Sequence, residues 1–379
     1  MLFFLFPCLL SDSNVKLPSN LIIGYPSWGE CDQKVIQADK DGVNVIIWFA
    51  INLLTNQTSG LPYITGGPDY DCVANTISYL NENNLSAVNL ISIGGWDAPH
   101  PDTKNNGSAY YNAWVQWNLE KRVPELGFNG FDGFDWDIEG NDNMSSPYNF
   151  FTIECLDLIG EMSQQAKKDG YIVSIVPAES YLDVTTSEFN RSLLHNYPEW
   201  EQLQPNFTYH GRNCYAYLIA KYGHTLVSDG NFIFTYDFVS IQFYEGFSHI
   251  EYNTSVLKQN ASDYLLRIIP KYIEGWKVNF EDDPDVNLKN QIIKIPKENL
   301  IIGLANGWAG DGKFILIEPE ELNRTYQELI KRDMKIRGFM FWDIADEGKV
   351  PIDSDKKLWL ATELNKFMKT RKIKRIIKF

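Results

Sequence analysis

Short apolar runs recur along this chain, and most are separated by stretches whose apolar residues recur with helical spacing. Runs with strand character cover residues 21–25, 44–50, 87–93, 131–137, 171–176, 237–243, 299–304 and 337–342. Predicted helices between them include residues 72–80, 109–125, 149–166 and 255–276. Short, almost continuously apolar runs are typical of parallel strands buried on both faces.

Eight such strands alternating with helices predict an α/β fold, most simply a single (β/α)8 TIM barrel. We expect residues 18–366 to form this one catalytic domain, because no repeat or interdomain linker divides them. An open, doubly wound sheet is the rival architecture. It would favour a glycine-rich nucleotide turn after the first strand, and Gly24-Tyr25-Pro26 is not such a turn.

The two ends of the chain differ from this pattern. Residues 2–10 are all apolar, which is too short for a membrane span of ~20 residues but fits the core of a signal peptide. We therefore predict a signal peptide in residues 1–12, although its only basic group is the amino terminus; a buried strand is the alternative. Residues 367–379 form a basic tail, for which we expect a solvated, fraying terminus rather than a docking or sorting role.

Cysteines and glycosylation sequons indicate the compartment. Removal of the signal peptide, which contains Cys8, would leave Cys31, Cys72, Cys155 and Cys214. An even number of cysteines suits an oxidising compartment, and the sequence leaves the disulfide connectivity open. Nine Asn-x-Ser/Thr sequons point the same way; they lie at Asn56, Asn84, Asn106, Asn143, Asn190, Asn206, Asn253, Asn260 and Asn323. We expect a secreted, extracellular protein.

The net charge of the chain limits the kinds of molecule that it is expected to bind. The formal net charge is -15, which argues against nucleic acid and against binding to an anionic membrane, and is compatible with a neutral polymer. Aromatic residues make up 14% of the chain and include eleven Trp; core packing and stacking platforms for sugar rings explain this equally well. No cysteine or histidine spacing suggests zinc, and we expect a monomer without metal or cofactor.

Residues 131–140, FDGFDWDIEG, concentrate the candidate chemistry. Side chains alternate along a strand, so Asp135, Asp137 and Glu139 share one face while Phe134, Trp136 and Ile138 share the other. The apolar face would pack on the outer helices, and the acidic face would point into the barrel. Clustered buried carboxylates are costly unless protonated or paired. Because barrel enzymes place their active sites at the C-terminal ends of the strands, these residues predict an active site.

Two kinds of site compete for these carboxylates. The spacing Asp135-x-Asp137-x-Glu139-Gly140 mimics the opening of a calcium-binding EF-hand loop. Such a loop requires a carboxylate at its twelfth position, which is Ser146 here, and lies between helices. Acid catalysis fits better: closely packed carboxylates raise one another's pKa, and a Glu kept protonated can donate to a glycosidic oxygen.

Four motifs together resemble glycoside hydrolase family 18, the chitinase family. Asp132-x-x-Asp135-x-Asp137-x-Glu139 resembles its DxxDxDxE signature. The other three are Ser92-Ile93-Gly94-Gly95 with Trp96 following, which resembles the SxGG motif; Gln242-Phe243-Tyr244, which resembles QxY; and Trp342, which ends the last strand where the family places a Trp beneath the substrate. They occur in the family's order over most of the chain.

The resemblance implies a retaining, substrate-assisted hydrolysis of β-1,4 linkages between N-acetylglucosamine units. Glu139 would protonate the leaving oxygen while Asp137 held the substrate's acetamido group. The resemblance further implies that Asp135 shares a proton with Asp137 and is supported by Tyr25 and Ser92. It also implies that Tyr244 binds the acetamido carbonyl and that Trp342 stacks under the sugar. Gln242, Trp96, Gly95 and Glu245 join these as expected substrate-binding residues, and Asp132 is expected to be a structural turn residue.

Several positions depart from the family pattern. Val176-Pro177-Ala178-Glu179 replaces the common Met-Ala-Pro-Glu, and Glu245 stands where Asp or Asn is commoner. Asp137-Ile138-Glu139 is closer to hevamine-like members. About 30 residues separate Gly307 from the last strand, which excludes an insertion domain and implies an open cleft with mainly endo cleavage. An endo-β-N-acetylglucosaminidase of N-glycan cores and a non-catalytic chitin lectin remain alternatives.

Overall fold

The computed structural model describes residues 15–29, 31, 33–85, 87–194, 211–246, 248–310, 314–352 and 354–369. The predicted signal peptide in residues 1–12, with Cys8, lies outside the described residues. So do Asn206 and most of the predicted basic tail. Residue 366, the expected domain boundary, falls inside helix α10 (Leu360–Met368), whose Phe367 packs on Tyr326 with 5.6 Å between ring centroids.

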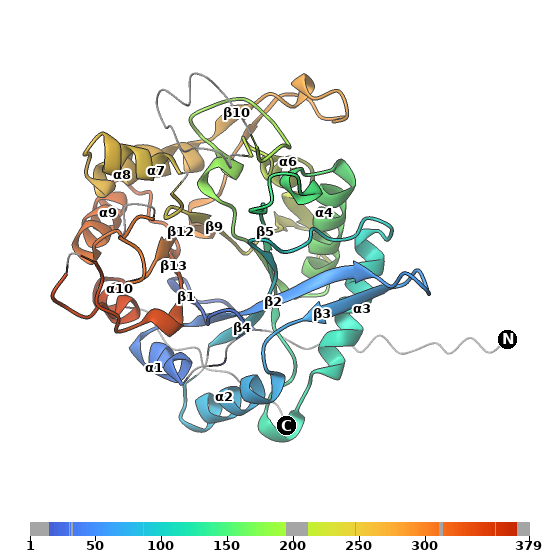
Figure 1. The fold of residues 1–379 in the computed structure, drawn as a ribbon, viewed down its shortest axis with the longest axis horizontal. Coiled ribbons are helices and arrows are strands. Elements are labelled where there is room, and N and C mark those ends of the chain that lie inside the picture. Colours follow the sequence, from blue (N-terminus) through green and yellow to red (C-terminus); the bar gives the residue numbers. More distant parts are fainter. Residues whose placement is uncertain are drawn as a thin grey trace.

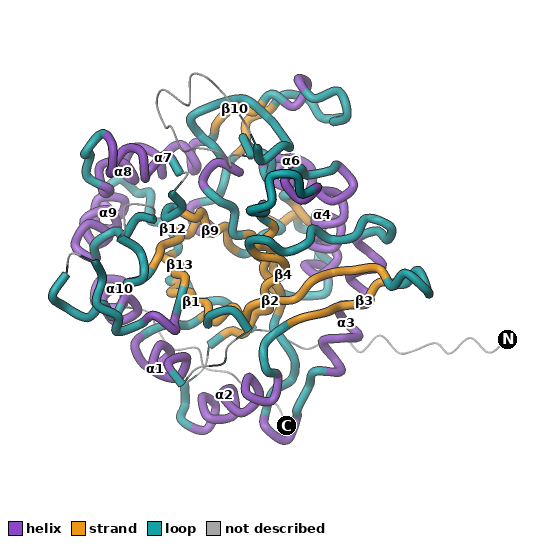
Figure 2. The backbone as a smooth tube through the Cα atoms, in the orientation of Figure 1, coloured by secondary structure: helices purple, strands orange, loops and turns teal. Residues whose placement is uncertain are grey.

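Eight parallel strands close into a barrel, as the sequence predicts (Figure 1). They are β1 (Leu21–Tyr25), β2 (Val45–Thr55), β4 (Val88–Gly95), β5 (Gly133–Ile138), β6 (Ile172–Ile175), β9 (Phe238–Gln242), β12 (Leu300–Ala305) and β13 (Gly338–Trp342). Pairing of β1 with both β13 and β2 closes the ring, which is the orange circle of Figure 2. The open doubly wound sheet is thereby excluded.

Helices surround the ring of strands (Figure 1). They are α1 (Lys34–Asp41), α2 (Tyr70–Glu82), α3 (Gly107–Glu120), α4 (Ile153–Lys168), α6 (Ala216–Tyr222), α7 (His249–Glu251), α8 (Ala261–Glu274), α9 (Pro319–Lys331) and α10. None of the described helices is both long enough and apolar enough to span a bilayer. The segment between β12 and β13 carries only α9 among its described residues, so no insertion domain is present there.

The helix boundaries differ from the sequence prediction where capping residues intervene. The predicted start at residue 255 is wrong: α8 begins at Ala261, because the Asn260 side chain accepts a hydrogen bond from the Ser262 amide at 2.9 Å and residues 252–256 form a separate π-turn. Likewise, Thr152 caps α4, so that helix begins at Ile153 rather than at residue 149. Short-range capping by polar side chains outweighs the apolar periodicity at these ends.

Three antiparallel strand pairs lie outside the predicted elements. Strand β2 runs past the barrel rim and pairs with β3 (Pro62–Gly66), which projects from the ring in Figure 1. The other two pairs are β7 (His224–Leu226) with β8 (Phe232–Phe234), and β10 (Trp276–Val278) with β11 (Gln291–Ile293). All of these strands except β2 have three to five residues, which is too short for periodicity to distinguish them from loops.

Two hydrophobic cores follow from strand alternation. Side chains that point inward fill the barrel, among them Ile23, Ile47 and Met340. Side chains that point outward pack against the helices, among them Trp48 and Phe134. The interior is therefore filled rather than hollow.

A disulfide joins Cys31, after β1, to Cys72 in the first turn of α2. Cys155 and Cys214 are both buried free thiols, and burial raises the pKa of Cys155 to about 12. The four cysteines outside the predicted signal therefore form one bridge and two inert thiols.

Candidate active site

Three carboxyl groups, two in β5 and the third directly after it, line the barrel interior at its C-terminal end. Asp135 is fully buried, and Asp137 and Glu139 are each 7% exposed. The intervening Phe134, Trp136 and Ile138 lie in the outer core, as the predicted alternation requires. Because this segment is a parallel strand between β4 and β6, it does not have the loop conformation that an EF-hand calcium site needs.

Asp135 is held by two hydroxyl groups at the floor of the site. Tyr25 of β1 donates a hydrogen bond to its Oδ2 at 2.8 Å, and Ser174 of β6 donates to its Oδ1 at 2.5 Å. Burial raises the pKa of Asp135 to about 6, and both hydrogen bonds oppose that rise by stabilising the carboxylate.

The second donor is not the one expected from the family resemblance. Ser92 of β4 is opposite Asp135 in the strand register, but its buried Oγ has no hydrogen-bond partner among the described residues. Ser174, which is opposite Asp135 on the other side, takes that place. A serine inside a short apolar run carries no distinguishing sequence signal, so only the register of β5 with β6 reveals it.

Asp137 and Glu139 share a hydrogen bond between their carboxyl groups. Burial raises the pKa of both, and the charge of Glu139 raises that of Asp137 further, so the pair loses its last proton less readily than two isolated carboxyl groups would. Each Asp135 oxygen accepts one hydrogen bond, from Tyr25 or Ser174, and the expected proton sharing between Asp135 and Asp137 stays a prediction.

Gln242, at the end of β9, links the two carboxyl groups. Its amide nitrogen lies 3.3 Å from Asp137 Oδ1 and 3.2 Å from Glu139 Oε1, and it also donates to the Val176 carbonyl at 2.7 Å. This side chain, which the sequence singled out as part of a QxY element, is 1% exposed. It therefore fixes the separation of the two acids from within the barrel.

The paired glycines of β4 let the backbone pass close to the acids. Gly94 and Gly95 have φ values of 105° and 111°, a region that L side chains rarely adopt. A Cβ on Gly94 would lie 2.5 Å from the Asp137 carbonyl oxygen, and one on Gly95 would lie 2.4 Å from the Phe49 ring. The SxGG sequence is thus explained by steric access beside Asp137.

Tyr244 and Glu245 stand at the rim beyond Gln242. Tyr244 is 8% exposed, and burial together with the nearby Glu245, Glu139 and Asp137 charges raises its pKa well above the usual value. Its hydroxyl therefore stays protonated and can donate to a bound acceptor. Glu245 is half-buried, and its negative charge raises the pKa of Asp137 further.

An aromatic cluster occupies the opposite side of the mouth. Trp342, the last residue of β13, lies edge-on to Phe49 and to Trp28, with ring centroids 4.9 Å and 5.7 Å apart. Trp28 is 54% exposed and was not singled out from the sequence. Trp96 is half-buried beyond β4, where its indole donates to Asp142 at 3.1 Å.

Three further polar residues act on the backbone rather than lining the mouth. His100 Nε2 lies 2.9 Å from the Glu139 carbonyl oxygen, and burial lowers the pKa of His100 to about 4, so the neutral ring donates this bond. Asp132 accepts a hydrogen bond from the Asn89 amide at 2.8 Å, the structural role expected of it. Glu179 accepts from Tyr264 and from the Ile250 amide and is 2% exposed. It is therefore engaged outside the acidic cluster.

No protein-family model matches the chain, and neither does any curated protein sequence. Similar solved structures do exist. A fungal endo-beta-N-acetylglucosaminidase from glycosyl hydrolase family 18 has 16% identity and a TM-score of 0.50 over 93% of this chain and 98% of its own. The ChiA C-terminal domain of Legionella pneumophila has 17% identity and a TM-score of 0.54 over 92% and 96%.

The catalytic domain of a hyperthermophilic chitinase from Pyrococcus furiosus also matches, with 13% identity and a TM-score of 0.50 over 93% of this chain and 96% of its own. The likeness shows a shared barrel fold. Identities this low leave substrate and activity to be argued from the side chains of the site.

Proposed function

We propose that this protein is a glycoside hydrolase of the family 18 type, a chitinase that cleaves β-1,4 linkages between N-acetylglucosamine units. The observation that carries the proposal is the Asp137–Glu139 carboxyl pair, bridged by Gln242 at the C-terminal mouth of the barrel. Solved structures of the same fold that are described as a chitinase and an endo-beta-N-acetylglucosaminidase support it.

The first step breaks the glycosidic bond. Glu139, whose pKa burial keeps elevated, donates its proton to the leaving oxygen as the C1–O bond lengthens. The acetamido oxygen of the same sugar attacks C1 from the opposite face, forming a bicyclic oxazolinium ion. Family 18 enzymes differ in this from two-carboxylate glycosidases.

The positive charge that develops on the substrate meets a negative site. Asp137 accepts a hydrogen bond from the acetamido N–H and stabilises the oxazolinium, with Asp135 behind it adding to the field. Tyr244 donates its hydroxyl to the acetamido oxygen, and Trp342 supports the lower face of the ring. In the second step Glu139, now ionised, takes a proton from water as the water attacks C1.

An open mouth favours endo cleavage. Between β12 and β13, the described residues hold no inserted domain that would build a wall beside the barrel. Exposed Trp28, next to Trp342, extends the aromatic surface outward and suits a chain that continues past the reacting sugar. We propose that both ends of a chito-oligosaccharide lie outside the site.

Secretion is part of the proposal. The N-terminal apolar run, the nine sequons and the Cys31–Cys72 disulfide all suit an extracellular protein. Two alternatives share the fold. An endo-β-N-acetylglucosaminidase of N-glycan cores is favoured by the fungal structure of that activity. A chitin lectin is disfavoured because both Asp137 and Glu139 are present.

Hydrolysis products distinguish these activities. The purified protein should convert chitotetraose and chitohexaose into shorter oligomers by internal cleavage, detectable by mass spectrometry. Release of intact glycans from a denatured N-glycoprotein, with chito-oligomers left uncut, would instead establish the endo-β-N-acetylglucosaminidase. Binding of oligomers without any product from either substrate would establish the lectin.

A further inference from the structure

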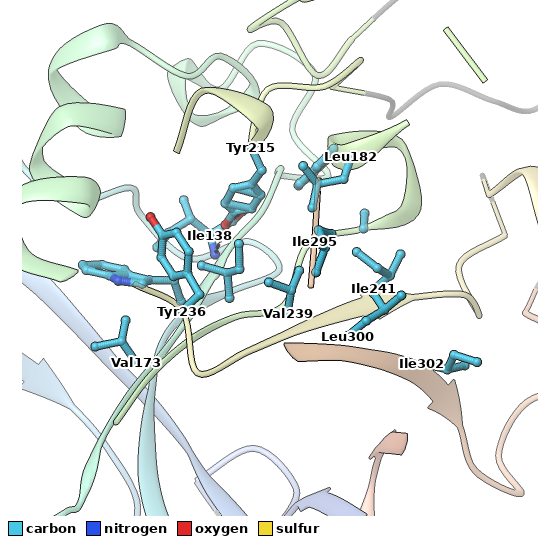
Figure 3. Close-up of a cluster of buried hydrophobic side chains, with 14 of the residues drawn as sticks. Ile138, Val173, Leu182, Tyr215, Tyr236, Val239, Ile241, Ile295, Leu300 and Ile302 are labelled. Carbon is cyan, nitrogen blue, oxygen red and sulfur yellow. Dashed lines mark hydrogen bonds between the residues drawn. The ribbon is translucent and has the colours of Figure 1, made fainter. Parts of the chain in front are cut away.

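A single buried hydroxyl group contacts the backbone between the two proposed catalytic acids. The Tyr215 hydroxyl accepts a hydrogen bond from the Ile138 amide at 3.0 Å and donates one to the Ile138 carbonyl at 2.9 Å. Figure 3 shows the Tyr215 ring directed at Ile138. The Ile138 amide belongs to the peptide that follows Asp137, and its carbonyl to the peptide that precedes Glu139. One phenol therefore fixes both peptide planes.

Tyr215 occupies a position that a neighbouring strand has left. The ladder between β5 and β6 ends where Trp136 pairs with Ile175. The last hydrogen bond of this ladder runs from the Val176 amide to the Trp136 carbonyl, at 3.0 Å. In a parallel strand, residues two apart point their amide and carbonyl groups to the same side, so those of Ile138 face the β6 side. In this register the next donor to the Ile138 carbonyl would be the Ala178 amide, but that bond does not form among the described residues, and the Val176 carbonyl accepts from Gln242 instead. Without Tyr215, both groups of Ile138 would be buried and unpaired.

The phenol itself is rigidly held. Tyr215 is fully buried, and its ring lies 5.6 Å from that of Tyr181 and 5.7 Å from that of Phe151. Its amide donates to the Tyr181 carbonyl at 3.1 Å. Burial raises the pKa of its hydroxyl well above the usual value, so the group remains a donor at any working pH. A side chain fixed at both ends transmits its position to the strand it contacts.

We propose that Tyr215 is a positioning residue that sets the mutual orientation of Asp137 and Glu139 by holding the backbone of Ile138. The inference rests on the proposed function for its catalytic consequence. Asp137 and Glu139 are consecutive inward-facing residues, and rotation of either intervening peptide would change the separation of their carboxyl groups. Gln242 fixes these groups from the side-chain end, and Tyr215 fixes them from the backbone end.

The test compares Tyr215→Phe with a matched control in the same aromatic group. Tyr181→Phe is suitable because the buried Tyr181 hydroxyl has no hydrogen-bond partner in the described part of the chain. With chitotetraose as substrate, Tyr215→Phe should lower kcat ~10–10²-fold with KM within about threefold of the original value, the pattern of misplaced catalytic groups rather than lost binding. Tyr181→Phe should leave both constants within about twofold. Both variants are assayed well below their measured Tm.

A carbon-13 NMR titration of the Asp137 and Glu139 carboxyls adds a readout that does not require turnover. Two closely coupled acids titrate with widely separated apparent pKa values. Tyr215→Phe should narrow this separation, because the acids are no longer held together, and Tyr181→Phe should not.

The outcomes separate the two proposals. An active original enzyme, with Tyr215→Phe unchanged in both kcat and titration, overturns the positioning role and leaves the proposed function standing. An inactive original enzyme overturns the proposed function, and the titration alone then decides whether Tyr215 positions the acids. Equal kcat losses in both variants would mean that any perturbation of this aromatic group matters, which also contradicts a specific role for Tyr215.

Discussion

Tyr25 Oη lies 2.8 Å from Asp135 Oδ2, a hydrogen bond that crosses the barrel interior from β1 to β5. These strands are not neighbours in the sheet, so the bond exists only because the barrel is closed. Its acceptor is the most deeply buried of the three carboxyl groups, and the bond favours the ionised form of that group. The fold thereby keeps a negative charge beneath the proposed reaction centre.

Tyr25→Phe should therefore raise the pKa of Asp135 above its value of about 6. Loss of a hydrogen bond to a charged group is worth about one pKa unit or more. Ionised Asp135 then appears only at higher pH, so the acidic limb of the kcat/KM profile should move upward. Tyr272→Phe is the control, because that buried hydroxyl has no partner among the described residues. An unmoved acidic limb in Tyr25→Phe would show that Asp135 ionisation does not control activity.

Glu139→Gln should abolish hydrolysis while leaving the fold and oligomer binding nearly intact. The substitution preserves shape but removes the transferable proton, and general acid catalysis contributes ~10²–10⁴-fold. Glu179→Gln is the matched control, since Glu179 is engaged by Tyr264 and the Ile250 amide outside the cluster. Turnover of Glu139→Gln above about a tenth of the original rate would be incompatible with its role as the acid.

Asp137→Asn should lower kcat/KM on chito-oligomers ~10²–10³-fold, because the acetamido group and the oxazolinium lose their charged partner. The matched substrate is a cellulose oligomer, which has the same linkage but no acetamido group. The original enzyme should not cleave it, as followed by release of reducing ends. Efficient cleavage of cellulose oligomers would contradict the participation of the substrate's own acetamido oxygen.

Glu347 should make folding stability depend on pH. Its carboxyl accepts from the Leu360 and Ala361 amides at the start of α10, and burial raises its pKa to about 7. The native state then binds more protons than the unfolded state above pH ~4.3, so stability falls as pH rises to about 7 and levels off beyond it. The contribution is at most ~4 kcal/mol.

Urea unfolding at pH 4.5, 6 and 8, values chosen to bracket the window from ~4.3 to about 7, measures this effect. Glu347→Gln should decline less over the range than the original protein, and Glu320→Gln, at an exposed position of α9, should decline equally. Parallel curves for all three proteins would show that Glu347 does not titrate in this window.

The barrel and its acidic strand can be predicted from the sequence, but the contacts between distant segments cannot. Period-two alternation places Asp135, Asp137 and Glu139 inward because it follows from strand geometry alone. Ser174 and Tyr215 escape prediction because their roles depend on which strand lies beside β5 and where the β6 chain turns away. Tyr215 is 77 positions from Ile138, and nothing local to it indicates a catalytic context.

Helix ends and hairpins escape prediction for a different reason. Asn260 and Thr152 start their helices through single side-chain hydrogen bonds, which outweigh the apolar pattern of the flanking residues. Strand β3 is defined by its pairing with the extended end of β2, a contact between separate segments. Its own five residues, Pro62–Gly66, have no buried face that could mark them as a strand.

The stereochemistry of the first product tests the central claim most directly. If the acetamido oxygen is the nucleophile, C1 inverts twice and the original configuration is retained. Proton NMR of chitotetraose during the first minutes of cleavage should then show the β-anomer before mutarotation. An inverting enzyme, with water acting directly between carboxylates ~6.5–9.5 Å apart, releases the α-anomer. Initial α-product would contradict the account and direct the search for a second catalytic carboxylate to Glu245.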